Sequence, residues 1–126
     1  MTPHRPSTDH PPRRIQLQRR KGWRIRQAVK VARPTVWGNP YRWQDYRADY
    51  PEDTDAELRA KAVSDFRGMV ERRWPGPEGT TYPHVVTIRH VLGGHDLACW
   101  CPIGEPCHAD VLLELANPDP TTKENP

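Results

Sequence analysis

The chain has 126 residues, a net charge of +3 and a hydrophobic share of only 35%, so it can bury one modest core. No apolar run approaches the roughly 20 residues of a membrane-spanning helix, and the first residues lack the apolar centre of a secretory signal. Three cysteines cannot all pair with one another, which favours a reducing compartment over a disulfide framework. We therefore predict a cytoplasmic protein that does not enter the membrane.

Proline and polar residues gather at both ends of the chain. They predict a disordered arm at residues 1–13 and a disordered tail at residues 118–126, around a single domain at residues 14–117. Residues 1–27 hold eight Arg or Lys and one acidic residue. Because a tryptophan stands among these cations, residues 14–26 could neutralise phosphates and stack on bases of a nucleic acid. The alternative is a solvated basic terminus.

Two short strands are predicted before a long loop. Residues 15–17 and 28–32 form alternating or β-branched runs, each followed by turn or proline signals. Residues 36–53 are rich in aromatic and turn-forming residues and show no periodicity. Loops of this length in a small domain are usually functional or mobile, so this loop is a candidate part of the functional site.

Two helices are predicted after the loop. Thr54 and Glu57 form a capping box at the start of residues 54–74, where apolar residues repeat at helical spacing. Residues 83–92 fit either a helix or a strand. We choose a helix, because a proline stands in its first turn and a pair of glycines follows it.

The last third of the chain predicts a strand, a loop and a helix. Residues 95–101 fit a buried strand, and Pro106 opens a helix over residues 107–116. This order of elements predicts a small single-domain α/β fold with a short, Rossmann-like sheet and about three helices. Ligands of such folds bind beyond the strand ends that lead into helices.

All three cysteines are close to a histidine near this last strand. Cys99 and Cys101 would project from one face of an extended strand, and Cys107 and His108 would begin the last helix. Together these four residues would form a Cys₃His set for a zinc ion. Adjacent Cys107 and His108 would point about 100° apart on a helix, which weakens this hypothesis.

Two other hypotheses remain for the cysteines. In a catalytic site, Cys107 would be a nucleophile whose pKa is lowered at the helix start, with His108 and Asp110 as its proton partners. Free N–H groups at that position could also bind a phosphate. Alternatively, the cysteines are small apolar core residues. The sequence leaves the three hypotheses open.

Two segments of the chain resemble one family. RPTVWGNPY, at residues 33–41, and LACWCPIGEPCHADVL, at residues 97–112, resemble the family known as domain of unknown function 4326, small proteins of bacteria and their viruses. The resemblance implies that the two segments belong to one unit and that their strand ends converge.

Convergence would place several side chains around one pocket. Arg33 and Asn39 would position a ligand, Gly38 would allow its close approach, and Trp37 or Trp100 would stack on a ring. We predict that the pocket binds, with or without transforming, a nucleotide-like or phosphorylated small molecule. The alternative is a non-enzymatic, zinc-stabilised module whose basic N-terminal arm contacts nucleic acid.

Overall fold

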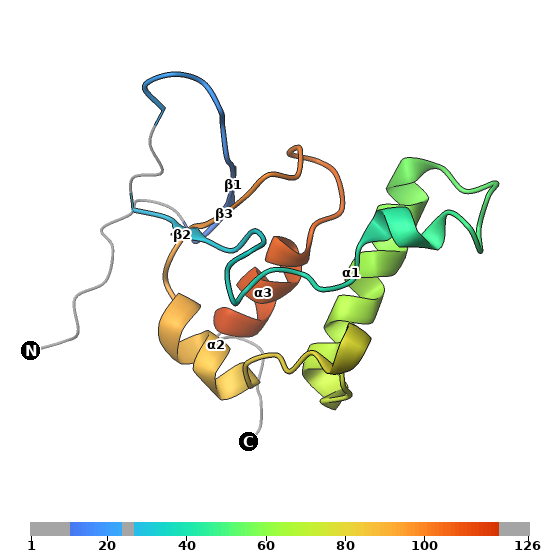
Figure 1. The fold of residues 1–126 in the computed structure, drawn as a ribbon. Helices are drawn as coiled ribbons and strands as arrows, with labels where there is room; N and C mark the ends of the chain where they lie inside the picture. Colours follow the sequence, from blue (N-terminus) through green and yellow to red (C-terminus); the bar gives the residue numbers. More distant parts are fainter. Residues whose placement is uncertain (1–10, 24–26, 119–126) are drawn as a thin grey trace, which may run out of the picture.

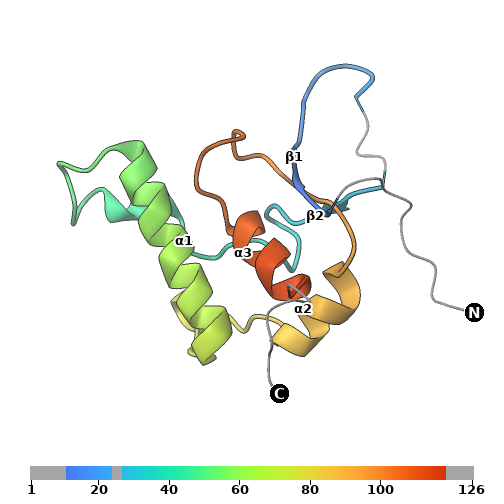
Figure 2. The ribbon, with the colours of Figure 1, turned by 180° about the vertical axis from the view of Figure 1, so that it is seen from behind.

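The structure is a computed structural model, and it describes residues 11–23 and 27–118 (Figures 1 and 2). Most of the two predicted terminal segments, residues 1–13 and 118–126, therefore lies outside the described residues, as do residues 24–26 of the basic segment. Within the described part of the chain, no helix is long and apolar enough to cross a membrane.

A short parallel sheet forms one side of the domain. Its strands are β1 (Arg14–Gln16), β2 (Val29–Lys30) and β3 (Leu97–Cys99), and their spatial order is β1-β3-β2. The central strand β3 is buried throughout, because it is paired on both edges. The predicted α/β class with a short parallel sheet is confirmed. β2 and β3 are shorter than predicted, and β1 has the predicted length but begins one residue earlier.

Three helices complete the fold: α1 (Asp55–Arg72), α2 (Val85–Leu92) and α3 (His108–Ala116). The capping box is confirmed, since the Thr54 hydroxyl accepts from the Glu57 N–H at 3.1 Å and the Glu57 carboxylate accepts from the Thr54 N–H at 2.8 Å. α1 ends earlier than predicted because Arg73 adopts a left-handed backbone conformation, with φ of 61°. Trp74, the last residue of the predicted apolar repeat, consequently lies beyond the helix and is 39% exposed.

The last helix lies at the centre of the domain. α3 contacts α1, α2, β1 and β3, and both views show it enclosed by these elements (Figures 1 and 2). Phe66 of α1, Ile88 of α2 and Leu112 of α3 are fully buried in the shared core. The N-terminus of α3 is thereby fixed against the ends of the strands.

Parallel strands direct their C-terminal ends to the same edge of the sheet. The loop after β2 contains the WGNP segment and leads through a short 3-10 helix, η1 (Trp43–Tyr46), to α1. The loop after β3 leads to α3. The WGNP segment is tied to neighbouring elements: the Tyr82 hydroxyl donates to the Trp37 carbonyl at 2.6 Å, and the Asn39 amide donates to the Ala62 carbonyl at 3.5 Å.

Candidate metal centre and ligand pocket

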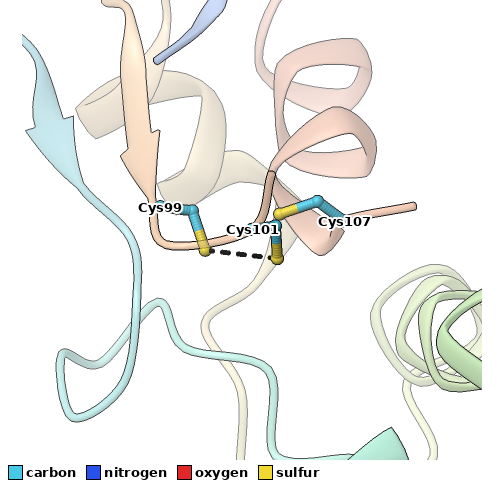
Figure 3. A group of neighbouring side chains, drawn as sticks. All are labelled: Cys99, Cys101 and Cys107. Carbon is cyan, nitrogen blue, oxygen red and sulfur yellow. Dashed lines mark hydrogen bonds between the residues drawn. The ribbon is translucent and has the colours of Figure 1, made fainter. Parts of the chain in front are cut away.

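The three cysteine sulfurs converge at the end of β3. The Sγ atoms of Cys99, Cys101 and Cys107 all lie within 4.8 Å of one another, and those of Cys99 and Cys101 are 3.8 Å apart (Figure 3). All three cysteines are free. Cys99 and Cys107 are buried and Cys101 is half-buried. Three converging thiols in this arrangement could bind a metal ion.

Cys107 is the N-cap of α3 and not its first helical residue. Its backbone is extended, with φ of −152° and ψ of 141°, and its sulfur accepts a hydrogen bond from the Ala109 N–H at 3.5 Å. The expected divergence of about 100° between adjacent helical residues therefore does not apply to Cys107 and His108. Their Sγ and Nδ1 atoms lie 3.8 Å apart, so both side chains face the cluster.

His108 is buried and held by the backbone. Its Nε2 lies 2.8 Å from the Val31 carbonyl oxygen, which can only accept, so Nε2 carries the proton. The lone pair of the neutral ring is then on Nδ1, the atom that faces Cys107. The ring also packs edge-to-face on Phe66, with centroids 5.2 Å apart. His108 is thus oriented as a candidate fourth ligand, although only the three sulfurs meet the common 4.8 Å limit.

The pKa values of the three thiols shift in different directions. Hydrogen bonds from Cys101 and Cys107, followed by one from His108, lower the pKa of Cys99. Hydrogen bonds with Cys101 and Cys99, together with burial, raise the pKa of Cys107. For Cys101 the hydrogen bond from Cys107 lowers the pKa, but the contact with Cys99 and burial outweigh it and raise the pKa to about 11.

The raised pKa of Cys107 contradicts one expectation from the sequence. The helix start was predicted to lower the pKa of Cys107, but the neighbouring sulfurs and burial dominate. Only one thiolate forms easily in the cluster without a cation. A divalent metal would relieve the repulsion between further thiolates.

Arg14 lies beside the cluster, with a side chain that is 8% exposed. Its Nη2 donates to the carbonyl of Pro102 at 3.1 Å, and its Nη1 is 3.4 Å from the carboxylate of Asp110. Burial would lower the pKa of Arg14, but contact with the Cys107 thiol and the charge of Asp110 raise it. Among the described residues, its Nη1 is the buried side-chain nitrogen that lacks a hydrogen-bond partner.

A pocket of about 240 Å³ opens beside the cysteines. Its lining comes from the cysteine-bearing loop and His108, from the loop after β2 and from α1. Its lining contains two arginines and, within the part of the chain that the structure describes, no carboxylate. The lining residues are Ala32, Arg33, Asn39, Tyr41, Trp43, Arg59, Ala62, Val63, Cys99, Trp100, Cys101, Pro106, Cys107 and His108.

The structure brings some of the predicted ligand-binding residues together and leaves others out. Arg33, Asn39 and Trp100 line the pocket, but Trp37 and Gly38 do not. Trp37 is buried in the core. A side chain at Gly38 would collide with Arg33, because a Cβ atom there would lie 2.6 Å from the Arg33 Cγ. Gly38 therefore allows the close approach of the protein's own chain, and not of a ligand.

The other predicted residues lie at the rim of the cluster or serve the fold. Asp110 is exposed, does not line the pocket and pairs with Arg14. The Asn39 side chain is engaged within the fold, since its oxygen accepts from the Tyr41 N–H at 2.8 Å and its nitrogen donates to Ala62. The catalytic roles expected for Cys107, His108 and Asp110 stay predictions.

Sequence reasoning missed the aromatic and charged pocket residues Tyr41, Trp43 and Arg59. The Arg59 guanidinium lies 4.7 Å from the centroid of the Trp43 ring and 3.4 Å from the Glu105 carboxylate. Tyr41 and Trp43 belong to the aromatic loop that was singled out as a candidate. Arg59 gave no signal, because a charged residue on a helix is usually only solvated.

The fold and the site define a small parallel α/β domain with a three-cysteine cluster in the wall of a pocket. Comparison of the sequence with protein families matches residues 15–118 to Domain of unknown function (DUF4326), and the chain belongs to this family. This confirms the family inferred from the paired WGNP and CWC…CH segments. No curated protein and no solved structure matches the chain.

Proposed function

We propose that this protein binds a phosphorylated, nucleotide-like small molecule in a pocket whose wall is held by a zinc ion. The observation that carries the proposal is the convergence of three thiols on one wall of a pocket that presents two arginines and, among the described residues, no carboxylate. Cys99, Cys101 and Cys107 would hold the metal, with His108 as the fourth ligand.

The distances in the cluster support zinc. Two thiolates at about 2.3 Å from a tetrahedral zinc ion are about 3.8 Å apart. Cys99 and Cys101 have this separation, at 3.8 Å. A thiolate and an imidazole nitrogen on the same ion are about 3.6 Å apart, close to the 3.8 Å between Cys107 and His108. The contact of the other His108 nitrogen with a backbone carbonyl is typical of metal-bound histidines.

A zinc ion at this position would connect the end of β3 to the start of α3 and so shape the pocket. Four protein ligands would make the site a closed, structural one and would leave no free thiol for chemistry. The proposal is therefore a binding function, with zinc as a structural component. A reactive Cys107 is the competing prediction for a metal-free protein.

The pocket chemistry favours an anion that carries a ring. Arg33 and Arg59 offer guanidinium groups, which bind phosphate oxygens with paired hydrogen bonds. Trp43 and Trp100 offer aromatic faces on which a base could stack. A nucleoside monophosphate combines both features and is the natural probe.

Replacing Arg59 tests the ligand half of the proposal. Arg59→Ala should weaken binding of a nucleoside monophosphate about 10- to 100-fold, because a charged hydrogen bond to phosphate contributes about 1.5–3 kcal/mol. Calorimetric titration of the full chain measures the dissociation constant. Arg72→Ala is the control, since Arg72 is also placed over a tryptophan but lies at the other end of α1, about 20 Å along the helix.

The ligand proposal fails if the full chain binds no nucleoside monophosphate, or if Arg59→Ala and Arg72→Ala bind it equally well. The unphosphorylated nucleoside should bind more weakly than the monophosphate. Equal affinity would remove the role assigned to the arginines.

Replacing Arg14 tests the surroundings of the metal. The buried Nη1 of Arg14, which has an ion-pair contact with Asp110 but no hydrogen bond, would donate to a zinc-bound thiolate of Cys107. Arg14→Met should therefore weaken zinc binding about 10- to 100-fold. Competition with a chromophoric chelator measures the affinity. Arg14→Lys keeps the charge but lacks the planar fork, and we expect an intermediate loss. Unchanged zinc affinity in Arg14→Met would contradict this account.

A further inference from the structure

A basic surface continues from the pocket onto the loop after β1. Arg19, Arg20 and Lys21 are exposed on this loop, which we call the basic loop. The Arg19 guanidinium lies 4.4 Å from the centroid of the Trp100 ring, and Trp100 lines the pocket. The basic loop and the pocket, which are far apart in the sequence, therefore meet at one tryptophan.

Trp100 lies at the pocket and not in the core, so a ligand can contact it. It is 37% exposed, although it directly follows the fully buried strand β3. Its sequence neighbours Cys99 and Cys101 belong to the cysteine cluster, while its indole lines the pocket. An indole flanked by arginine is a typical stacking platform for the bases of single-stranded nucleic acids.

Cations predominate on this side of the molecule, although Asp110 pairs with Arg14 and Glu105 pairs with Arg59. Residues 11–23 contain no acidic residue, and the lining of the pocket adds Arg33 and Arg59. Phosphates that are spaced along a strand could thus meet cations both in the pocket and on the basic loop. Arg24 and Arg26 lie outside the described residues and carry no part of this argument.

The size of the pocket also points to a ligand that extends beyond it. Its volume of about 240 Å³ lies below the range of roughly 300–1,000 Å³ of pockets that enclose a whole drug-sized molecule. A pocket of this size can take no more than one nucleotide unit. Anything attached to that nucleotide would have to leave the pocket, and Trp100 and the basic loop lie at its border.

We infer that the natural ligand is a nucleotide within a single-stranded nucleic acid. One nucleotide occupies the pocket, an adjacent base stacks at Trp100, and neighbouring phosphates bind the basic loop. The inference rests on the proposed function of the pocket and extends it from a free nucleotide to a strand.

The test compares a nucleoside monophosphate with fluorescent single-stranded DNA and RNA oligonucleotides of about ten nucleotides, using the full chain. We expect the preferred oligonucleotide to bind at least about tenfold more tightly than the monophosphate, because stacking contributes for each added base. Its affinity should fall steeply with salt, because each phosphate contact adds about 0.7 to the log–log slope.

A double variant isolates the basic loop. Arg20→Ala with Lys21→Ala removes two cations but keeps Arg19 on Trp100, so the slope for oligonucleotides should fall by about 1.4 while monophosphate binding is unchanged. The charge-matched control is Arg72→Ala with Arg73→Asn, at the end of α1. Asparagine tolerates the left-handed backbone of Arg73. This control should bind oligonucleotides like the wild type.

The outcomes separate the inference from the proposed function. If the monophosphate binds and the oligonucleotides bind no more tightly, the ligand is a free nucleotide and the inference is wrong, while the proposed function stands. If the control variant loses as much oligonucleotide affinity as the basic-loop variant, binding reflects only overall charge and the inference is again wrong. If neither ligand binds, both fail.

Discussion

Cys99→Ser will abolish stoichiometric zinc binding and destabilise the protein more than any surface substitution. Cys99 stands at the end of the central strand, is buried, and has its sulfur within 4.8 Å of the other two. The metal would link this strand to α3, and the free energy of zinc binding contributes to folding. We expect a loss of about 4 kcal/mol or more in the free energy of unfolding. For a domain of this size, that lowers the melting temperature by more than about 15 °C.

Thermal denaturation with and without a chelator, together with elemental analysis, measures both effects. The wild type in chelator is the internal control, because it has lost the metal but kept the thiol. Cys99→Ser should melt close to the chelated wild type, and chelator should not change it further. If the wild type has the same melting temperature with and without chelator, a structural metal is excluded.

Phe66→Ala will produce the second large effect. Phe66 is fully buried, and its ring contacts those of Tyr82 and His108 edge-to-face at centroid distances of 5.0 and 5.2 Å. Removing the ring leaves a cavity in the centre of the core, which should cost about 3–5 kcal/mol of stability. It also removes the support of the His108 ring, so zinc should be bound more weakly.

Urea denaturation gives the change in free energy of unfolding. Phe66→Leu is the matched control, since it keeps most of the apolar volume and should cost clearly less than Phe66→Ala. A loss below about 1 kcal/mol for Phe66→Ala would show that this site does not anchor the core.

Much of the helical structure could be predicted from local signals. The capping box of Thr54 and Glu57 marked the start of α1, and the two glycines after residue 92 marked the end of α2. The bounds of the strands were harder to predict, because only three residues of β1 and two of β2 form ladder pairs. Their length depends on which neighbours the tertiary fold supplies, and periodicity does not contain that information.

The candidate site could be predicted only in part, for two physical reasons. The sequence identified the cysteines and the WGNP segment, but the objection to His108 assumed a helical backbone at Cys107. That residue is extended, and its conformation was not visible in the sequence. Arg14 and Arg59 were missed as site residues because their importance arises from contacts with residues more than forty positions away, Pro102 and Glu105.

X-ray absorption at the zinc edge of the purified full-length protein tests the central claim most directly. We expect about one zinc ion per chain with three sulfur ligands at about 2.3 Å and one nitrogen ligand at about 2.0–2.1 Å. Protein that is purified without added chelator yet contains no zinc, or zinc surrounded only by oxygen and nitrogen, would contradict it.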